Sequence, residues 1–236
     1  KIVRMIYTMV IAFVATFYPR IAYYIQNDNK NESNKLIEKG FDIILLMALP
    51  CTVGLLSTAK YIVLILFGNQ YMKSIPVLKV ASVLVFVFSV AYLLGHIILM
   101  ASGQEKYILK ATIVGAVVNA ILNTCLIPKY AENGATIASV ISEIVVTFVL
   151  IFHSRKNFSI SKDYSFIRSI GLSVLFMTIG IAGVKKYFLF TDSISFQFIE
   201  IIVVAVLIYV GTLIVTRNRL LIEAKNLMVR KKLERR

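Results

Sequence analysis

Chemically reactive side chains are scarce in this sequence. Its 236 residues include two cysteines, Cys51 and Cys125, and two histidines, His96 and His153. Their spacing fits no metal-ligand pattern, and both cysteines lie within apolar runs. The sequence also lacks a phosphate-binding glycine loop and the strained nucleophile turn of hydrolases. These absences argue against an enzyme, a bound metal, a cofactor, and ATP hydrolysis by this chain.

Charged residues are also few, at 16%, whereas 58% of the residues are hydrophobic and the mean hydropathy is +0.81. Soluble domains are typically about 45–50% apolar. A helix needs about 20 apolar residues to cross the hydrocarbon of a bilayer, and no run here alternates like an outer-membrane strand. Seven apolar runs are Met5–Ile25, Ile43–Phe67, Val77–Ser102, Leu109–Ile127, Ala135–Phe152, Ile167–Val184 and Ile199–Val215. We therefore expect an all-α polytopic membrane protein with seven transmembrane helices. The last run has no lysine for a Schiff base, which disfavours a retinal protein.

Basic residues are distributed unevenly around these runs. The net charge is +14, and seventeen lysines and arginines fall on the side of the membrane that the tail shares, against four on the opposite side. Cytoplasmic loops carry the excess of basic residues, so we expect a cytoplasmic C-terminus and no nucleic-acid partner. The first helix would then run from outside to inside. Because the chain also begins with Lys1 instead of methionine, we expect it to be part of a longer protein.

The stretch from Thr112 to Glu143 predicts a packed helical hairpin. Thr112, Gly115, Asn119 and Asn123 share one face of its first run, and Ala135, Ala138, Ser139 and Ser142 share one face of the second. We expect Pro128 to end the first helix and Asn133-Gly134 to form the turn. Small residues allow helices to approach closely in lipid, and buried amides need protein partners there.

The hairpin also carries a set of residues with a family likeness. They are Asn119, Asn123, Leu126-Ile127-Pro128, Tyr130, Gly134-Ala135, Ile137-Ala138 and Ile141-Ser142-Glu143, with weaker matches at Pro19-Arg20-Ile21 and in the Leu49-Pro50, Gly54-Leu55, Phe67-Gly68 and Tyr71 run. This pattern resembles bacterial polysaccharide flippases of the multidrug/oligosaccharidyl-lipid/polysaccharide exporter superfamily. The family usually has a glycine after the tyrosine, where this chain has Ala131.

The resemblance implies the second lobe of a two-lobed, MATE-like flippase with 12 or 14 helices. Residues 1–153 would form five helices of the C-terminal lobe, residues 154–216 two peripheral helices, and residues 217–236 a basic cytoplasmic tail. This tail, in which basic and apolar residues are interspersed, is expected to lie as an amphipathic helix on anionic lipid or to stay in solution. The polar linker Gln26–Gly40 is expected to be a solvated cytoplasmic loop.

The implied function is the flipping of undecaprenyl-diphosphate-linked oligosaccharide repeat units across the bacterial plasma membrane by alternating access. Its partners would be that lipid-linked oligosaccharide, membrane lipids, and a polysaccharide polymerase with its chain-length regulator. Two alternatives stay open. One is a drug or metabolite cation antiporter of the same superfamily, and the other is a non-transporting membrane subunit of a polysaccharide-synthesis complex.

Two cations are candidates for binding the diphosphate. Arg20 follows Pro19, which is expected to kink the first helix at its inner end. Lys60 lies about two-thirds of the way across the second helix, where a charge is costly unless it faces a cavity or a partner. The alternative for both is that the side chain snorkels to the membrane surface.

Four further polar side chains lie within predicted helices. His96 would couple transport to protons or serve as a hydrogen-bonded packing residue. Asn119 and Asn123 would bind substrate or join neighbouring helices. Glu143 lies about a third of the way along its helix, and would take part in ion coupling or accept a structural hydrogen bond.

Overall fold

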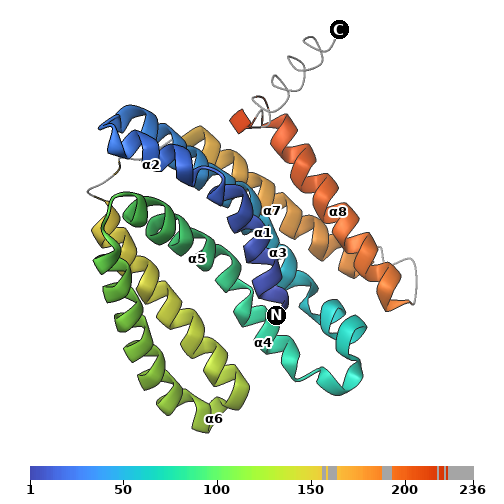
Figure 1. Ribbon diagram of the computed structural model, residues 1–236. Helices are drawn as coiled ribbons and strands as arrows, with labels where there is room; N and C mark the ends of the chain where they lie inside the picture. The colour runs from blue at the N-terminus through green and yellow to red at the C-terminus, as the bar shows by residue number, and fades with distance from the viewer. Residues whose placement is uncertain (156–157, 159–163, 188–192, 217, 221, 223–236) are drawn as a thin grey trace. The chain divides into compact units, whose positions relative to one another are not determined.

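The computed structural model describes residues 1–155, 158, 164–187, 193–216, 218–220 and 222, and every regular element among them is helical (Figure 1). The chain forms two compact units, residues 1–161 and residues 162–236. The elements of the N-terminal unit are α1 (Ile2–Ala15), α2 (Tyr18–Gln26), α3 (Lys30–Phe67), η1 (Asn69–Tyr71), α4 (Ser74–Ala81), α5 (Val83–Tyr92), η2 (Leu93–Leu99) and α6 (Glu105–Ser154). Those of the C-terminal unit are α7 (Tyr164–Tyr187) and α8 (Ile194–Val215).

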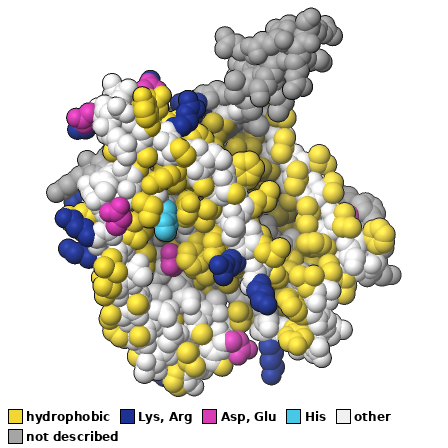
Figure 2. Space-filling model, viewed as in Figure 1, with side chains coloured by type: hydrophobic (Ala, Val, Ile, Leu, Met, Phe, Trp, Pro, Cys, Tyr) yellow, Lys and Arg dark blue, Asp and Glu magenta, His cyan; other side chains and the backbone are white. Residues whose placement is uncertain are grey.

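The helices have the length and composition of membrane spans. Among the described residues, α3, the Ser74–Leu99 segment, α6, α7 and α8 are each long and apolar enough to cross a bilayer, and α1 with α2 makes a sixth span if the bent pair is one. Helix α6 has 50 residues and folds back on itself, so its two arms provide two of the predicted crossings (Figure 1). The all-α polytopic membrane fold is thus confirmed. Hydrophobic side chains also cover much of the visible surface (Figure 2), as expected for helices in contact with lipid.

The predicted kink in the first span is present. Helices α1 and α2 are bent by 41° relative to each other, and Pro19 lies in the first turn of α2. Proline is well tolerated there because the first helical N–H groups have no carbonyl partner inside the helix. The bend places Arg20 on α2, beyond the break.

The prediction of a solvated loop over Gln26–Gly40 is wrong from residue 30 onward, where the chain is helical. Helix α3 begins at Lys30, and the Asn29 side chain caps it by accepting a hydrogen bond from the Glu32 amide at 3.3 Å. Ile37 and Gly40 are buried on the face that continues to Ile44. The linker is polar on average, but its few apolar residues have helical spacing, and this spacing outweighs the composition.

The third span contains a wide turn that the sequence does not reveal. Residues Leu93–Leu99 form a π-helix (η2) after α5. Six of its seven residues are buried, and His96 is exposed. π-Helical turns are rare and often occur at functional sites. Here the turn packs the apolar side chains into the core and turns the imidazole outward.

Helix α6 is a hairpin, as predicted, but its reversal lies elsewhere. The chain turns at Ala131, which has φ 47° and ψ −126°, and helical structure includes both Pro128 and Asn133. This backbone conformation is close to that of the first central residue of a type II′ turn, which favours glycine. The predicted turn residue Gly134 instead permits close packing, because a Cβ atom there would collide with the Leu126 carbonyl.

The C-terminal unit is a pair of helices held by an apolar interface with one polar end. On α8 the buried residues follow a four-residue spacing: Ile201, Ala205, Tyr209 and Leu213. At one end of the pair, the Ser169 and Thr216 hydroxyls are 2.6 Å apart, and the Asn218 side chain donates to the Ser169 hydroxyl at 3.2 Å. Most of the predicted basic tail, residues 217–236, lies outside the described residues.

Candidate functional site

A cleft of about 570 Å³ opens in the N-terminal unit among α1, α5, η2 and both arms of α6. One wall is the polar face of the α6 hairpin that the sequence predicts. The polar side chains that line the cleft are Tyr7, Tyr92, His96, Thr112, Asn119, Ser139, Ser142 and Glu143. Of the predicted site residues, the structure therefore brings together His96, Asn119 and Glu143.

A short hydrogen-bond chain joins the two arms of α6 in this wall. The Asn119 amide donates to the Ser142 hydroxyl at 3.0 Å, and the Asn123 amide donates to the Asn119 carbonyl oxygen at 2.8 Å. Ser142 in turn donates to the Ala138 carbonyl at 2.6 Å. Asn119 thus links the helices and also faces the cleft. Asn123 is not a lining residue, and its buried carbonyl oxygen has no hydrogen-bond partner.

Aromatic side chains form the opposite wall. The His96 imidazole stacks on Tyr92, with ring centroids 5.0 Å apart and planes inclined by 27°. Tyr7 of α1 packs against Phe88 of α5 with centroids 4.9 Å apart. The π-helical turn carries His96, so the local backbone geometry directs this ring toward the cleft.

Glu143 is the acidic side chain of the cleft. It lies on the second arm of α6 and is partly buried. Within the described part of the chain, its carboxylate makes no ion pair. An ionisable group within a transmembrane helix is costly without a partner. This position suits a carboxylate that binds a proton or a cation from the cleft.

The two predicted diphosphate ligands lie outside the cleft. Arg20 is exposed on α2, and Lys60 is exposed on α3, and neither is a lining residue. Among the described residues, the cleft lining contains no lysine or arginine. The cleft can therefore offer hydroxyl, amide, imidazole and carboxylate groups, which suit sugar hydroxyls or cations better than phosphate.

Sequence patterns miss the contribution of α1. Tyr7 and Ile11 reach the cleft from a helix about a hundred residues away in the sequence from the α6 hairpin. Neither belongs to a polar stripe, so no periodic signal marks them. No cluster of three potential metal ligands occurs among the described residues.

The sequence and the fold of this chain are similar to those of known proteins. The family model described as "Lipid II flippase MurJ" matches residues 5–208. A curated relative, the probable low-salt glycan biosynthesis flippase Agl15 of Haloferax volcanii, is 28% identical over 175 residues, which cover 74% of this chain and 37% of the relative. A solved structure of the lipid II flippase MurJ in an inward closed conformation has a TM-score of 0.73 and 22% identity, over 91% of this chain and 46% of that one.

The fold and the candidate spans define an all-helical, multi-pass membrane protein. The chain belongs to the MurJ family of lipid II flippases. It spans less than half the length of the curated relative and of the solved structure. The expected membership of the flippase superfamily is thus confirmed. The expected specificity for polysaccharide repeat units stays a prediction.

Proposed function

We propose that the full-length protein moves an oligosaccharide linked to undecaprenyl diphosphate from the cytoplasmic to the outer leaflet of a bacterial plasma membrane. The observation that carries the proposal is the family match over residues 5–208. The relative named as a glycan biosynthesis flippase supports the class of cargo. Sugars and phosphates are costly to bury in hydrocarbon without polar partners, so a flippase must provide a polar route. The polar side chains that line the cleft of the N-terminal unit would form one part of such a route.

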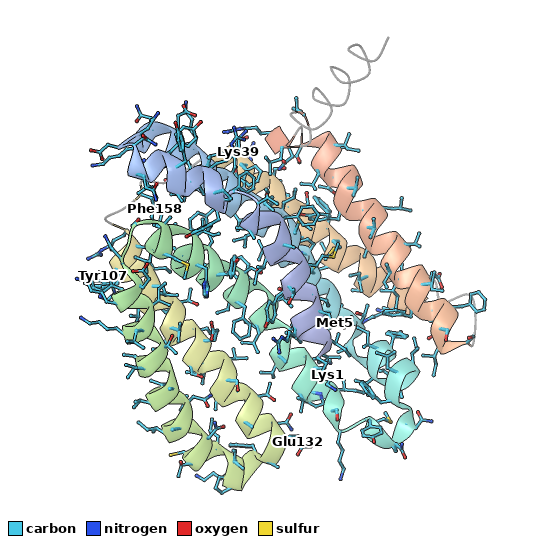
Figure 3. All side chains as sticks on the ribbon, viewed as in Figure 1. Lys1, Met5, Lys39, Tyr107, Glu132 and Phe158 are labelled. Atoms are coloured by element: carbon cyan, nitrogen blue, oxygen red, sulfur yellow. The ribbon has the colours of Figure 1, made fainter. Side chains whose placement is uncertain are left out.

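The proposed orientation places the C-terminus in the cytoplasm and treats this chain as the C-terminal lobe. In Figure 3, Lys39, Tyr107 and Phe158 lie toward one end of the N-terminal unit, and Lys1 and Glu132 toward the other. The basic connections that we assign to the cytoplasm begin near the first group. The positive-inside rule supports this direction.

The site divides into two parts in this proposal. His96, Asn119 and Glu143 form a cleft that meets sugar hydroxyls and couples transport to an ion or a proton, while Asn123 positions Asn119. The exposed cations Arg20 and Lys60 contact the carrier diphosphate outside the cleft. We assign sugar binding to the cleft and diphosphate binding to residues outside it, because no basic side chain lines the described cleft.

Depletion of the full-length protein, followed by complementation, tests the proposal. Depletion should cause lipid-linked glycan to accumulate on the cytoplasmic side, and wild-type protein should reverse this. Lys60→Ala should fail to complement at normal abundance, Lys60→Arg should complement in part, and Lys60→Glu should be the least active. Lys79, another exposed lysine of the same unit, provides the matched control Lys79→Ala, which should complement fully.

Two results would oppose the proposal in different ways. Unchanged glycan export together with greater sensitivity to cationic drugs would indicate the drug-exporter alternative. Full activity of Lys60→Ala would remove Lys60 from the diphosphate site but would leave flipping itself intact.

A further inference from the structure

A second hollow of the N-terminal unit is entirely apolar. This groove, of about 320 Å³, lies between α3, α5 and the second arm of α6. It is lined by Phe41, Ile44, Leu45, Phe86, Val87, Val90, Ile144, Thr147, Phe148 and Ile151. The hydroxyl of Thr147 is already engaged, because it donates to the Glu143 carbonyl at 2.8 Å. The groove therefore offers hydrocarbon surface and no free polar group.

The groove is separate from the polar cleft although both use the second arm of α6. Ser142, Glu143 and Val146 face the cleft, whereas Ile144, Phe148 and Ile151 face the groove. The two hollows thus lie on different faces of one helix. A ligand in the groove need not touch the groups proposed for transport.

A basic residue, Arg155, comes after the groove residues of α6 in the sequence and lies on the same helical face. At 100° per residue, Arg155 falls within about 40° of Ile144, Phe148 and Ile151. It is exposed just beyond the end of α6, and its guanidinium carbon lies 4.3 Å from the centroid of the Phe152 ring. Among the described residues, Arg155 has no carboxylate partner. The Arg155 backbone thus continues the groove face beyond Ile151, and its guanidinium, which lies over Phe152 beside that face, is available to an anion.

The dimensions match one leaflet of a bilayer. With a rise of 1.5 Å per residue, the α6 part of the groove from Ile144 to Ile151 is about 10 Å long, and Arg155 lies about 6 Å beyond it. Half of the hydrocarbon core is about 15 Å thick. A lipid with its phosphate at Arg155 would thus place its chain along the groove.

We infer that this groove binds one hydrocarbon chain of an anionic phospholipid from the surrounding leaflet, with the lipid phosphate against Arg155. The apolar lining selects a hydrocarbon chain, and the exposed guanidinium beyond its end selects a negative headgroup. The inference does not depend on the proposed flipping activity, since a bound phospholipid need not be transported.

Tryptophan fluorescence provides a direct test, because this chain contains no tryptophan, and the signal of the unsubstituted full-length protein is subtracted from that of each variant. Phe148 lines the groove and is 65% exposed, so Phe148→Trp places a reporter in it with little change in packing. The full protein is reconstituted in phosphatidylcholine vesicles that contain an equal fraction of chain-brominated phosphatidylglycerol or chain-brominated phosphatidylcholine. Bromine quenches tryptophan on contact. Ile121→Trp, at a 59% exposed position of the first α6 arm, is the control.

The expected result is that the Phe148→Trp reporter has about a fivefold preference for the brominated phosphatidylglycerol, as one basic residue near the surface would give. Arg155→Gln should reduce this preference to about one, and Arg155→Lys should retain part of it. The Ile121→Trp reporter should be quenched equally by both lipids. Equal quenching at Phe148→Trp, or a preference that survives Arg155→Gln, would overturn the inference. Absence of quenching at Phe148→Trp alone would also overturn it, since the groove would then be covered by protein.

Discussion

Gly134→Ala tests how closely the arms of α6 pack behind their reversal. An ideal Cβ at Gly134 would lie 2.7 Å from the Leu126 carbonyl carbon and 3.1 Å from the Ile127 nitrogen. These are backbone atoms, so the strain cannot be relieved by rotating a side chain. Forcing a methyl group into a packed site typically costs about 1–3 kcal/mol, and alanine returns about 0.5–1 kcal/mol of helix preference. We expect a net destabilisation of about 1–2 kcal/mol.

The matched control is Gly54→Ala in α3 of the same unit, where a Cβ would meet nothing within 4 Å. This substitution should stabilise the protein by about 0.5–1 kcal/mol, so the two variants should shift stability in opposite directions. Both are measured by unfolding the purified protein in mixed micelles with increasing SDS, followed by circular dichroism. A Gly134→Ala protein as stable as the wild type would refute the packing argument.

Two further predictions concern the same hairpin. Ala131→Gly should raise stability in the SDS titration by about 1 kcal/mol, because Ala131 has a positive φ that costs a non-glycine residue about that much; a loss of stability would show that the strain is absent. Asn119→Ala and Ser142→Ala should be non-additive, with a coupling free energy near 0.6 kcal/mol, the average for such hydrogen bonds in membranes. Strict additivity in the double-mutant cycle would mean that the bond across the arms contributes nothing.

The positions of the membrane spans could be predicted from the sequence, because each span is marked by its own run of apolar residues. Each of the seven predicted apolar runs overlaps a helix, the bent α1–α2 pair, the continuous Ser74–Leu99 segment or one arm of α6. The bend before Pro19 is also local, since it depends on one residue that cannot continue the preceding helix. The polar face of the hairpin follows from helical periodicity, and the Asn119–Ser142 bond confirms that the two stripes meet.

Errors occur where tertiary packing decides the outcome. The segment from Lys30 to Gly40 is polar in composition, but the burial of Ile37 against the core makes it helical. At the hairpin, the Asn133-Gly134 pair has the composition of a turn. Yet Gly134 is used for a close backbone approach, and the reversal falls on Ala131.

The site is predictable only in part for the same reason. The sequence singles out His96, Asn119 and Glu143 as polar side chains within predicted helices, and all three line the cleft. Tyr7 joins them through the packing of α1 against α5, for which no pattern exists in the sequence. The π-helical turn that exposes His96 also depends on its buried neighbours and leaves no sequence signal.

The central claim is that the full-length protein flips a lipid-linked glycan. The most direct measurement reconstitutes it in vesicles whose lipid-linked glycan carries a fluorophore, and follows the exposure of this fluorophore to a membrane-impermeant quencher. We predict faster exchange between leaflets than in protein-free vesicles, and slower exchange with Glu143→Gln than with the wild type. Exchange at the protein-free rate, by wild-type protein shown to be folded, would contradict the account.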